Sequence, residues 1–334
     1  MPIEVESALQ RLVALRFWKR FIDRAVRFIV VYCHSNSIKG APMPDVGNEQ
    51  LRSWMFVPGN RDRFIQKAKT SSADAILLDI EDGVLPAEKP DARRMIAAAL
   101  PQQDAGPRRY VRVNALSTPW LQPDLEAVVV PGVEGICLTK VVKPQDILET
   151  ASLIEGLEKK RGLEIGKVRI LAAIESARGL MNSLAIADAH PRVIGLMFGA
   201  EDYALDLGLG ARREKEAAEL LFARSYVVNA AAAANVLSID GVFPNLDDPE
   251  GLVADVRQAR RLGFTSKSTF NPRQIDVINQ VFSPQPDEIE YARKIAAGFR
   301  AAEARGDASV AVGGQLVDRP IVLRALRILE VIGE

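Results

Sequence analysis

Eight short apolar segments recur after residue 51, and each is followed by a stretch with helical periodicity. Apolar runs of this length predict strands, and their regular alternation with helices predicts a parallel sheet. Several of the helical stretches open with Pro or Asp and end near Gly, as helices commonly do. The predicted strands are residues 51–58, 73–80, 109–114, 134–141, 168–175, 193–200, 236–243 and, with a weaker pattern, 264–270. Eight such repeats favour a closed (β/α)₈ TIM barrel.

An open, doubly wound sheet is the alternative arrangement of the same repeats. A dinucleotide-binding sheet of that type carries a GxGxxG motif after its first strand, and the chain has none there. Runs such as AILLDI and VIGLMFG are nearly continuously apolar, which is typical of parallel strands buried on both faces. We therefore predict a closed catalytic barrel for residues 51–283.

Composition limits the class of partner. The 43 basic residues balance the 43 acidic ones, so no overall field attracts nucleic acid, and small molecules are the predicted partners. Cys33 and Cys137 lie far apart, without metal-ligand or redox spacing, which favours a cytoplasmic protein without a disulfide. All apolar stretches are shorter than the roughly 18 residues of a transmembrane helix, so no membrane span is expected.

The two ends of the chain differ from the repeats. Residues 11–33 combine helical spacing with interspersed Arg and Lys, and three interpretations stay open: a membrane or targeting helix, a helix packed on the barrel, and a non-native extension. Residues 35–50 are predicted to be a linker, with Met43 as a possible alternative start, so that residues 1–50 form an extension. Residues 284–334 are predicted as helix, Gly-containing extended segment and helix, an appendage that could cover a barrel mouth.

Charged residues stand where four predicted strands end: Arg112, Lys140, Glu175 and Asp202. In a barrel these positions converge on one mouth and face a shared pocket. Glu175 and Asp202 end adjacent strands, so their carboxylates can approach one metal ion. Two hard oxygen ligands suit Mg²⁺, whereas Zn²⁺ prefers His or Cys, and both histidines lie outside the strand ends.

The same two carboxylates also have a structural interpretation, in which they cap helices or pair with Arg178 and Lys140. Glu201, beside Asp202, is ambiguous because adjacent strand residues point to opposite faces.

A second acidic cluster stands at the end of the second predicted strand, and it consists of Asp79, Glu81 and Asp82. These side chains could orient metal-bound waters, hold Lys140 or Arg112 in place, or simply begin a loop, and an orienting role is favoured over direct ligation. The guanidinium of Arg112 can bind an oxyanion or a carboxylate in a geometry that lysine does not reproduce. It could equally form a salt bridge with Glu175 or Asp79, and both roles can hold together.

Seven ordered segments together resemble the citrate lyase beta-subunit-like family, which includes malyl-CoA and citramalyl-CoA lyases. They span residue 51 to about residue 328 and read LRSWMFVPGNRDRFIQKA, LLDIEDGVLPAEKPDAR, VRVN, AAIESARGL, FGAEDYALDLG, IDGVFPNLDDPEGL and GQLVDRPIVLRA. Each motif alone is weak, but their order makes the resemblance specific.

The resemblance implies a Mg²⁺-dependent carbon-carbon lyase on a (β/α)₈ barrel. Such an enzyme cleaves a 3-hydroxyacyl-CoA, such as citramalyl-CoA or malyl-CoA, to acetyl-CoA and a 2-oxoacid, or forms it from them. It implies that Glu175 and Asp202 bind Mg²⁺ and that Arg112, with Glu175 beside it, contacts substrate. It also implies a homotrimer or hexamer in which a C-terminal segment covers a neighbouring site, where Asp318 matches the acid/base residue. Lys140 is then an electrostatic support.

Departures from the family pattern concern the substrate. Asn271 and Pro272 stand where the family commonly has His-Pro, Thr139 and Lys140 where it has Pro-Lys, and Ser176 replaces a usual Thr. None of these changes removes a proposed metal ligand.

Three other functions stay open. A CoA-thioester hydrolase would use the same scaffold with water as the attacking group. A carrier-protein-dependent citryl lyase subunit is disfavoured by the C-terminal segment, which the shorter subunits of that type tend to lack. A noncatalytic CoA-binding protein is disfavoured because the proposed site residues are retained together.

Overall fold

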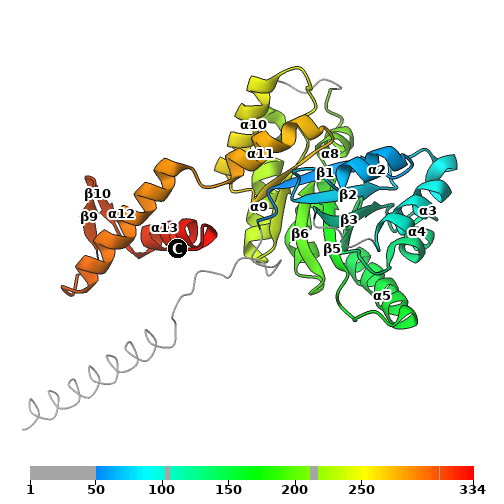
Figure 1. The fold of residues 1–334 in the computed structure, drawn as a ribbon, viewed down its shortest axis with the longest axis horizontal. Coiled ribbons are helices and arrows are strands. Elements are labelled where there is room, and N and C mark those ends of the chain that lie inside the picture. The colour runs from blue at the N-terminus through cyan, green and yellow to red at the C-terminus, as the bar shows by residue number, and fades with distance from the viewer. Residues whose placement is uncertain (1–49, 102–105, 211–216, 308) are drawn as a thin grey trace, which may run out of the picture. The chain divides into compact units, whose positions relative to one another are not determined.

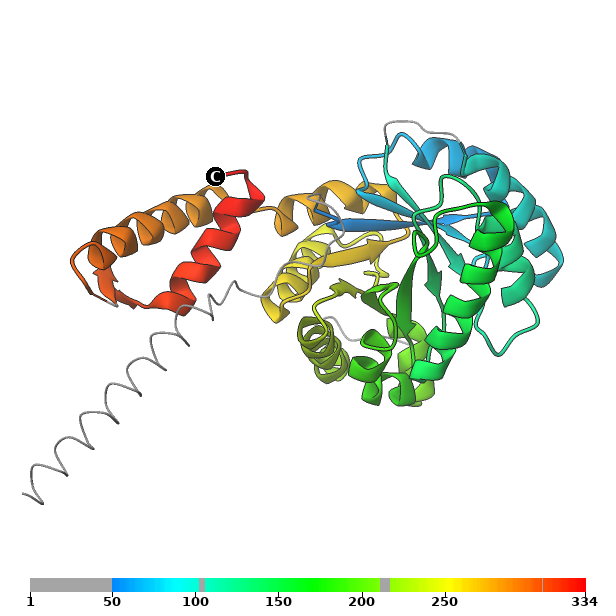
Figure 2. The same cartoon turned by 90° about the horizontal axis from the view of Figure 1, so that it is seen from below.

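Eight parallel strands close into a barrel in the order of the sequence, and helices surround it (Figures 1 and 2). The computed structural model describes residues 50–101, 106–210, 217–307 and 309–334. The strands are β1 (Ser53–Pro58), β2 (Ala75–Asp79), β3 (Arg108–Val113), β4 (Gly135–Leu138), β5 (Arg169–Ile174), β6 (Val193–Phe198), β7 (Leu237–Asp240) and β8 (Ser266–Thr269). The predicted TIM barrel is confirmed.

The helices follow the predicted alternation with two differences. They are α2 (Asp62–Ala68), α3 (Lys89–Ala99), α4 (Leu121–Val128), α5 (Pro144–Arg161), α6 (Ala177–Met181), α7 (Ser183–Ala187), α8 (Ala200–Asp206), α9 (Leu221–Ala233), α10 (Pro249–Leu262) and α11 (Ile275–Phe282), with 3₁₀ turns η1 (Pro86–Glu88), η2 (Ala218–Leu220) and η3 (Pro272–Gln274). The helical periodicity of residues 176–189 predicts a single helix, but it is divided at Asn182, where the backbone leaves helical geometry. The periodicity of residues 213–234 predicts a helix that begins outside the described residues, and α9 is regular from Leu221.

Two hydrophobic layers result from the alternation of side chains along the strands. Trp54, Leu77 and Met197 belong to a cluster inside the barrel, whereas Ile76 and Leu196 belong to a larger cluster between the strands and the helices. Both faces of each strand are therefore buried, which explains the continuous apolar runs of the sequence. Polar residues at the carboxyl ends of the strands lie above the inner layer.

The C-terminal residues form a small helical pair with its own core. It contains α12 (Pro286–Glu303), an antiparallel hairpin of β9 (Val310–Val312) and β10 (Gln315–Val317), and α13 (Arg319–Val331). Ile295, Val317 and Leu329 pack in its centre. The predicted order of helix, extended segment and helix is found, and the extended segment is a hairpin. Asp318 caps α13, where its side chain accepts a hydrogen bond from the Ile321 N–H.

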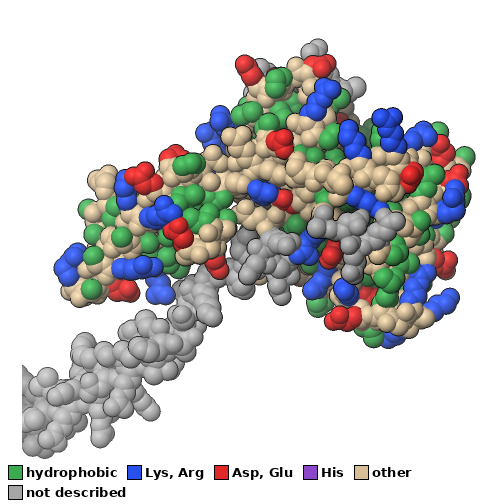
Figure 3. Space-filling model, viewed as in Figure 1, with side chains coloured by type: hydrophobic (Ala, Val, Ile, Leu, Met, Phe, Trp, Pro, Cys, Tyr) green, Lys and Arg blue, Asp and Glu red, His purple; other side chains and the backbone are tan. Residues whose placement is uncertain are grey.

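The predictions for residues 1–49, including the basic helix, the linker and Met43, lie outside the described residues, as does Cys33. Cys137 is a buried free thiol. Within the described part of the chain, no helix is long and apolar enough to cross a membrane. On the face seen in Figure 3, basic and acidic side chains are interspersed, in keeping with the balanced charge of the sequence.

Candidate active site

A pocket of about 340 Å³ opens at the carboxyl ends of the barrel strands. This is the end of a (β/α)₈ barrel where the loops that follow the strands build active sites. Five residues predicted for the site line it: Asp79, Asp82, Arg112, Glu175 and Asp202. The expected convergence of the strand-end residues is therefore found for these side chains.

Glu175 follows β5 directly and is 7% exposed. Its Oε2 atom accepts a hydrogen bond of 2.6 Å from the backbone N–H of Lys140. Gly199, which precedes α8, lies so close that an added Cβ would be 2.3 Å from the Glu175 Cγ and 2.6 Å from its Oε1. A side chain at position 199 would displace the carboxylate, so the glycine makes room for it.

Asp202 lies in the first turn of α8, one residue after Glu201, and not on the strand that precedes it. The assumption that adjacent residues face opposite sides of a strand therefore does not apply here, because β6 ends at Phe198 and the helix begins at Ala200. Both Glu201 and Asp202 line the pocket. Acidic residues at this end of a helix are favoured by its dipole.

Arg112 is fixed by the acidic cluster at the end of β2, which consists of Asp79, Glu81 and Asp82. Its Nε and Nη2 atoms donate to the two carboxylate oxygens of Asp79, each at 2.7 Å, and its Nη1 lies 3.5 Å from Glu81. The guanidinium also lies over the ring of Phe56, with 4.6 Å between its Cζ and the ring centroid. The salt bridge with Asp79 that the sequence allowed is present, and it holds the guanidinium in one orientation at the pocket wall.

Lys140 lies between the acidic cluster at the end of β2 and the Asp202 carboxylate. Its ammonium donates to Glu81 at 2.6 Å and to Asp82 at 3.1 Å, and it lies 3.9 Å from Asp202. The backbone of Lys140 has a φ of 54°, a left-handed conformation that costs a non-glycine residue about 1 kcal/mol or more. This conformation accompanies the hydrogen bond from its N–H to Glu175. Burial opposes the charge of the ammonium, but the hydrogen bond to Glu81 and the nearby carboxylates raise its pKa above the ordinary value.

Burial raises the pKa of the Glu175 carboxyl to about 7, and the negative charges of Glu81 and Asp202 act in the same direction. The Lys140 N–H and the Arg112 guanidinium lower this pKa and offset part of the effect. The Glu175 carboxylate is therefore an electrostatically strained group, which a bound cation would stabilise.

The stability of the metal-free protein should reveal this strain. The folded pKa of Glu175 is raised from 4.5 to about 7, so its stabilising contribution is present below pH 4.5 and is lost as the pH rises through 7. In EDTA, we expect the free energy of unfolding of the wild type to fall by about 3 kcal/mol relative to Glu175→Gln between pH 4.5 and 8. Denaturant unfolding of both proteins across this pH range measures the difference, and parallel curves would contradict the raised pKa.

The donor set of the pocket fits a hard divalent cation. Its charged ligand candidates are carboxylates, and the described residues contain no group of three or more His, Cys, Asp or Glu side chains arranged around one metal position. Mg²⁺ commonly uses only one or two protein carboxylates and keeps water or substrate in its other positions, whereas structural Zn²⁺ needs four protein ligands. Glu175 and Asp202 thus suit Mg²⁺.

The pocket also contains residues that the sequence did not single out. Phe270, which is 58% exposed, packs on Phe56 with 5.0 Å between the ring centroids, and Val242 and Ser268 complete that wall. An aromatic residue at the carboxyl end of the predicted strand 264–270 was the available signal. Asp318 is absent from the pocket lining among the described residues.

The three departures from the family pattern have local structural roles. The side chain of Asn271 accepts a hydrogen bond from the Arg273 N–H and caps η3. Thr139 donates to the Val113 carbonyl at 2.9 Å, and Ser176 caps α6. All three side chains thus hydrogen-bond to backbone groups, and those of Asn271 and Ser176 cap helical turns.

A (β/α)₈ barrel with buried carboxylates beside a fixed guanidinium at its mouth has the arrangement in which barrel enzymes place their active sites. Residues 52–272 match the HpcH/HpaI aldolase/citrate lyase family, and the chain belongs to this family. The family relationship predicted from the sequence motifs is therefore confirmed, and so is the enzyme class, a lyase.

Two relatives and one solved structure show what the chain is similar to. The chain is 40% identical to citrate lyase subunit beta of Leuconostoc mesenteroides subsp. cremoris, over 85% of this chain and 94% of the relative. It is 36% identical to a (3S)-malyl-CoA thioesterase of Cereibacter sphaeroides, over 84% of this chain and 93% of the relative. A crystal structure of the CitE protein of Mycobacterium tuberculosis with magnesium, acetoacetate and coenzyme A has a TM-score of 0.72 and 30% identity, and covers 86% of this chain and 100% of that one.

Proposed function

We propose that the protein is a Mg²⁺-dependent lyase that cleaves a 3-hydroxyacyl-CoA, such as citramalyl-CoA or malyl-CoA, to acetyl-CoA and a 2-oxoacid. The observation that carries this proposal is the position of Glu175, Asp202 and Arg112 around one pocket at the catalytic end of the barrel. The crystal structure of the CitE protein with magnesium and coenzyme A supports the choice of cofactor and thioester.

The carboxylates of Glu175 and Asp202 would hold Mg²⁺. When bound, this ion supplies Lewis acidity at the substrate hydroxyl and at the carboxylate next to it. The buried Glu175 side chain has a fixed direction because the Lys140 N–H and the close approach of Gly199 hold it. Such a preorganised ligand need not reorient during the reaction.

Arg112 would stabilise the negative charge that develops on the substrate. In the cleavage, the hydroxyl gives its proton to solvent water and its oxygen becomes the carbonyl of the 2-oxoacid, while the bond between the α and β carbons breaks and its electron pair moves into the thioester enolate. A fixed guanidinium directed at the thioester oxygen interacts more strongly with the enolate than with the neutral thioester, so it lowers the barrier. Asp79 and Glu81 support this role because they orient Arg112.

Asp318 would give a proton to the enolate carbon, and in the condensing direction it would remove the same proton from acetyl-CoA. Asp318 is exposed and does not line the pocket of the described chain. We therefore propose that residues 284–334 act as a lid over the site of a neighbouring subunit in a homotrimer or hexamer. The separate core of α12, α13 and the hairpin is consistent with a segment that packs as one unit.

Two alternative activities, those of a thioesterase and of a citryl lyase subunit, would use the same site. A thioesterase is favoured by the 36% identical (3S)-malyl-CoA thioesterase, and a citryl lyase subunit by the 40% identical citrate lyase subunit beta. Both relatives are covered over more than nine tenths of their length, so identity alone does not separate these activities.

Product analysis separates them. The purified protein should be assayed with malyl-CoA, citramalyl-CoA and β-methylmalyl-CoA, with and without Mg²⁺, while 2-oxoacid and free thiol are measured together. We expect Mg²⁺-dependent formation of a 2-oxoacid in equal amount to acetyl-CoA. Release of free CoA without carbon-carbon cleavage would identify a thioesterase, and activity only with acyl groups on a carrier protein would identify a citryl lyase subunit.

A further inference from the structure

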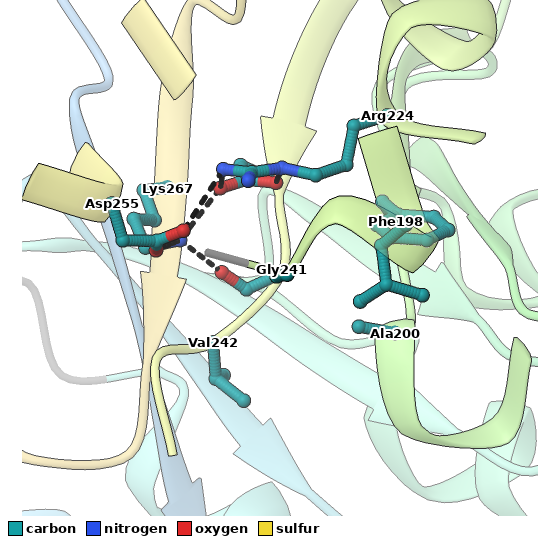
Figure 4. A pocket seen from close by; sticks show the side chains of 10 residues that line it. Phe198, Ala200, Arg224, Gly241, Val242, Asp255 and Lys267 are labelled. Carbon is teal, nitrogen blue, oxygen red and sulfur yellow. Dashed lines mark hydrogen bonds and ion pairs between the residues drawn. The ribbon is translucent and has the colours of Figure 1, made fainter. Parts of the chain in front are cut away.

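Four charged side chains that the proposed reaction does not use meet in the layer between the barrel and its outer helices (Figure 4). They are Arg224 of α9, Asp240 at the end of β7, Asp255 of α10 and Lys267 of β8. The Lys267 ammonium, on a side chain that is 2% exposed, lies 2.6 Å from Asp240 and 2.6 Å from Asp255. Arg224 donates to both oxygens of Asp240, at 3.0 and 2.8 Å. We call these four residues the buried charge network.

Stability alone does not account for such a network. Buried ion pairs lose hydration that their mutual attraction only partly returns, and apolar replacements of similar volume are often neutral or stabilising. The lysine ammonium can, however, donate three hydrogen bonds in different directions, which an apolar side chain cannot do. Lys267 donates one hydrogen bond to Asp240 and forms an ion pair with Asp255, so the position of its uncharged acceptor indicates what the network does.

This uncharged acceptor is the carbonyl oxygen of Gly241, at 2.6 Å. The pairing of β7 with β8 extends to Asp240, so Gly241 is the first residue beyond the strand ladder. From the other face of β8, the Ser268 hydroxyl donates to the Asp240 carbonyl at 2.9 Å. Two neighbouring side chains of β8 thus hold consecutive carbonyls at the start of the loop, and the next residue, Val242, lines the main pocket.

Gly241 in turn packs against the turn that carries Asp202. A Cβ atom at position 241 would lie 3.0 Å from the Phe198 carbonyl oxygen and 3.3 Å from the Ala200 Cβ. Phe198 and Ala200 line both the main pocket and the small cavity beside the buried charge network. Ala200 is the first residue of α8, and Asp202 is in the same turn. A continuous series of contacts therefore joins Lys267 to Asp202.

We propose that the buried charge network is a positioning device, which holds Gly241 and the first turn of α8 so that the Asp202 carboxylate keeps one direction in the pocket. Arg224 also contacts both carboxylates, but of the two basic residues in the network only Lys267 contacts the Gly241 carbonyl as well, so it is the central positioning residue. The expected effect on Mg²⁺ affinity rests on the proposed function, whereas the expected effect on the order of the backbone around Gly241 and α8 does not.

The test uses the charge-balanced double variant Lys267→Met/Asp255→Asn, which removes one charge of each sign and leaves the Arg224 pair with Asp240. In the metal-free protein, we expect hydrogen exchange of the amides of residues 200–206 and 241–244 to be about tenfold faster. With Mg²⁺, we expect its dissociation constant to rise about tenfold, because a displaced ligand loses its preorganised geometry. Calorimetric titration measures this constant.

A buried ion pair elsewhere in the barrel provides the matched control. Arg192 and Glu158 are 3% and 0% exposed, form two hydrogen bonds of 2.8 and 2.5 Å, and do not line the main pocket. The double variant Arg192→Met/Glu158→Gln also removes one charge of each sign. This control should leave hydrogen exchange at residues 200–206 and Mg²⁺ affinity unchanged, even if its melting temperature falls as much as that of Lys267→Met/Asp255→Asn.

A second test does not alter any charge. Gly241→Ala places a methyl group against Ala200 and should reproduce the faster exchange at residues 200–206. Unchanged exchange in both Lys267→Met/Asp255→Asn and Gly241→Ala, or equal exchange in the Arg192 control, would overturn the proposal. A wild type that binds no Mg²⁺ would overturn the proposed function instead, and hydrogen exchange would still decide the role of the network.

Discussion

Glu175→Gln is expected to abolish measurable Mg²⁺ binding and to lower turnover by about a thousandfold or more, since the reaction loses both charge stabilisation and substrate orientation. Glu175 is the most buried carboxylate of the proposed metal site, with 7% of its surface exposed. Glutamine keeps the size of the side chain but removes its charge and replaces one oxygen by a donor that repels a cation. Calorimetric titration with Mg²⁺ and steady-state turnover with citramalyl-CoA measure the two effects.

The neighbouring acidic residues of α8 provide the comparison. Asp202→Asn should weaken Mg²⁺ binding severely, whereas Glu201→Gln, in the same helical turn, should change the dissociation constant by less than about threefold. Both residues line the pocket, so the pair distinguishes a ligand from a carboxylate that only adds to the local field. Full Mg²⁺-dependent turnover in Glu175→Gln would exclude the proposed metal site.

The barrel could be predicted because its strands and helices each require a distinct pattern of apolar residues in the sequence. Strands buried on both faces need continuous apolar runs, and helices that pack outside them need a period near 3.6, so both element types leave clear patterns. The carboxyl ends of parallel strands meet at one mouth, and that topological rule brought Arg112 and Glu175 together without any coordinates. The expectation that Glu201 and Asp202 face opposite sides failed because β6 ends at Phe198 and both residues lie in the first turn of α8.

The details of the site depend on distances that a sequence does not contain. That Arg112 pairs with Asp79 on the neighbouring strand follows from their register, in which the two residues are directly paired. The burial of Lys267 could not be predicted, because a lysine in the polar segment TSKST is indistinguishable from a solvent-facing residue. Its burial arises only when α9 and α10 bring Arg224 and Asp255 over the end of β8, so tertiary packing decides its role.

Asp318→Asn is expected to retain Mg²⁺ and 2-oxoacid binding but to lower cleavage about 10² to 10⁴-fold, the usual contribution of a general acid or base. Asparagine is as good a helix N-cap as aspartate, so the hydrogen bond from the Ile321 N–H and the fold of α13 should persist. A loss of activity would then report the missing proton transfer rather than unfolding. Turnover, Mg²⁺ titration and the melting temperature should be measured on the same preparation, and unimpaired turnover would remove Asp318 from the mechanism.

Subunit mixing tests whether Asp318 acts in a neighbouring site. Glu175→Gln lacks the metal ligand and Asp318→Asn lacks the acid, so each alone should be nearly inactive. If the lid comes from another subunit, mixed oligomers contain sites with a native pocket from one chain and a native Asp318 from the other. Random reassembly of equal amounts should then restore about a quarter of wild-type turnover. If each chain covers its own pocket, every site in the mixture keeps one defect and no activity returns, which would contradict a shared site while leaving the role of Asp318 intact.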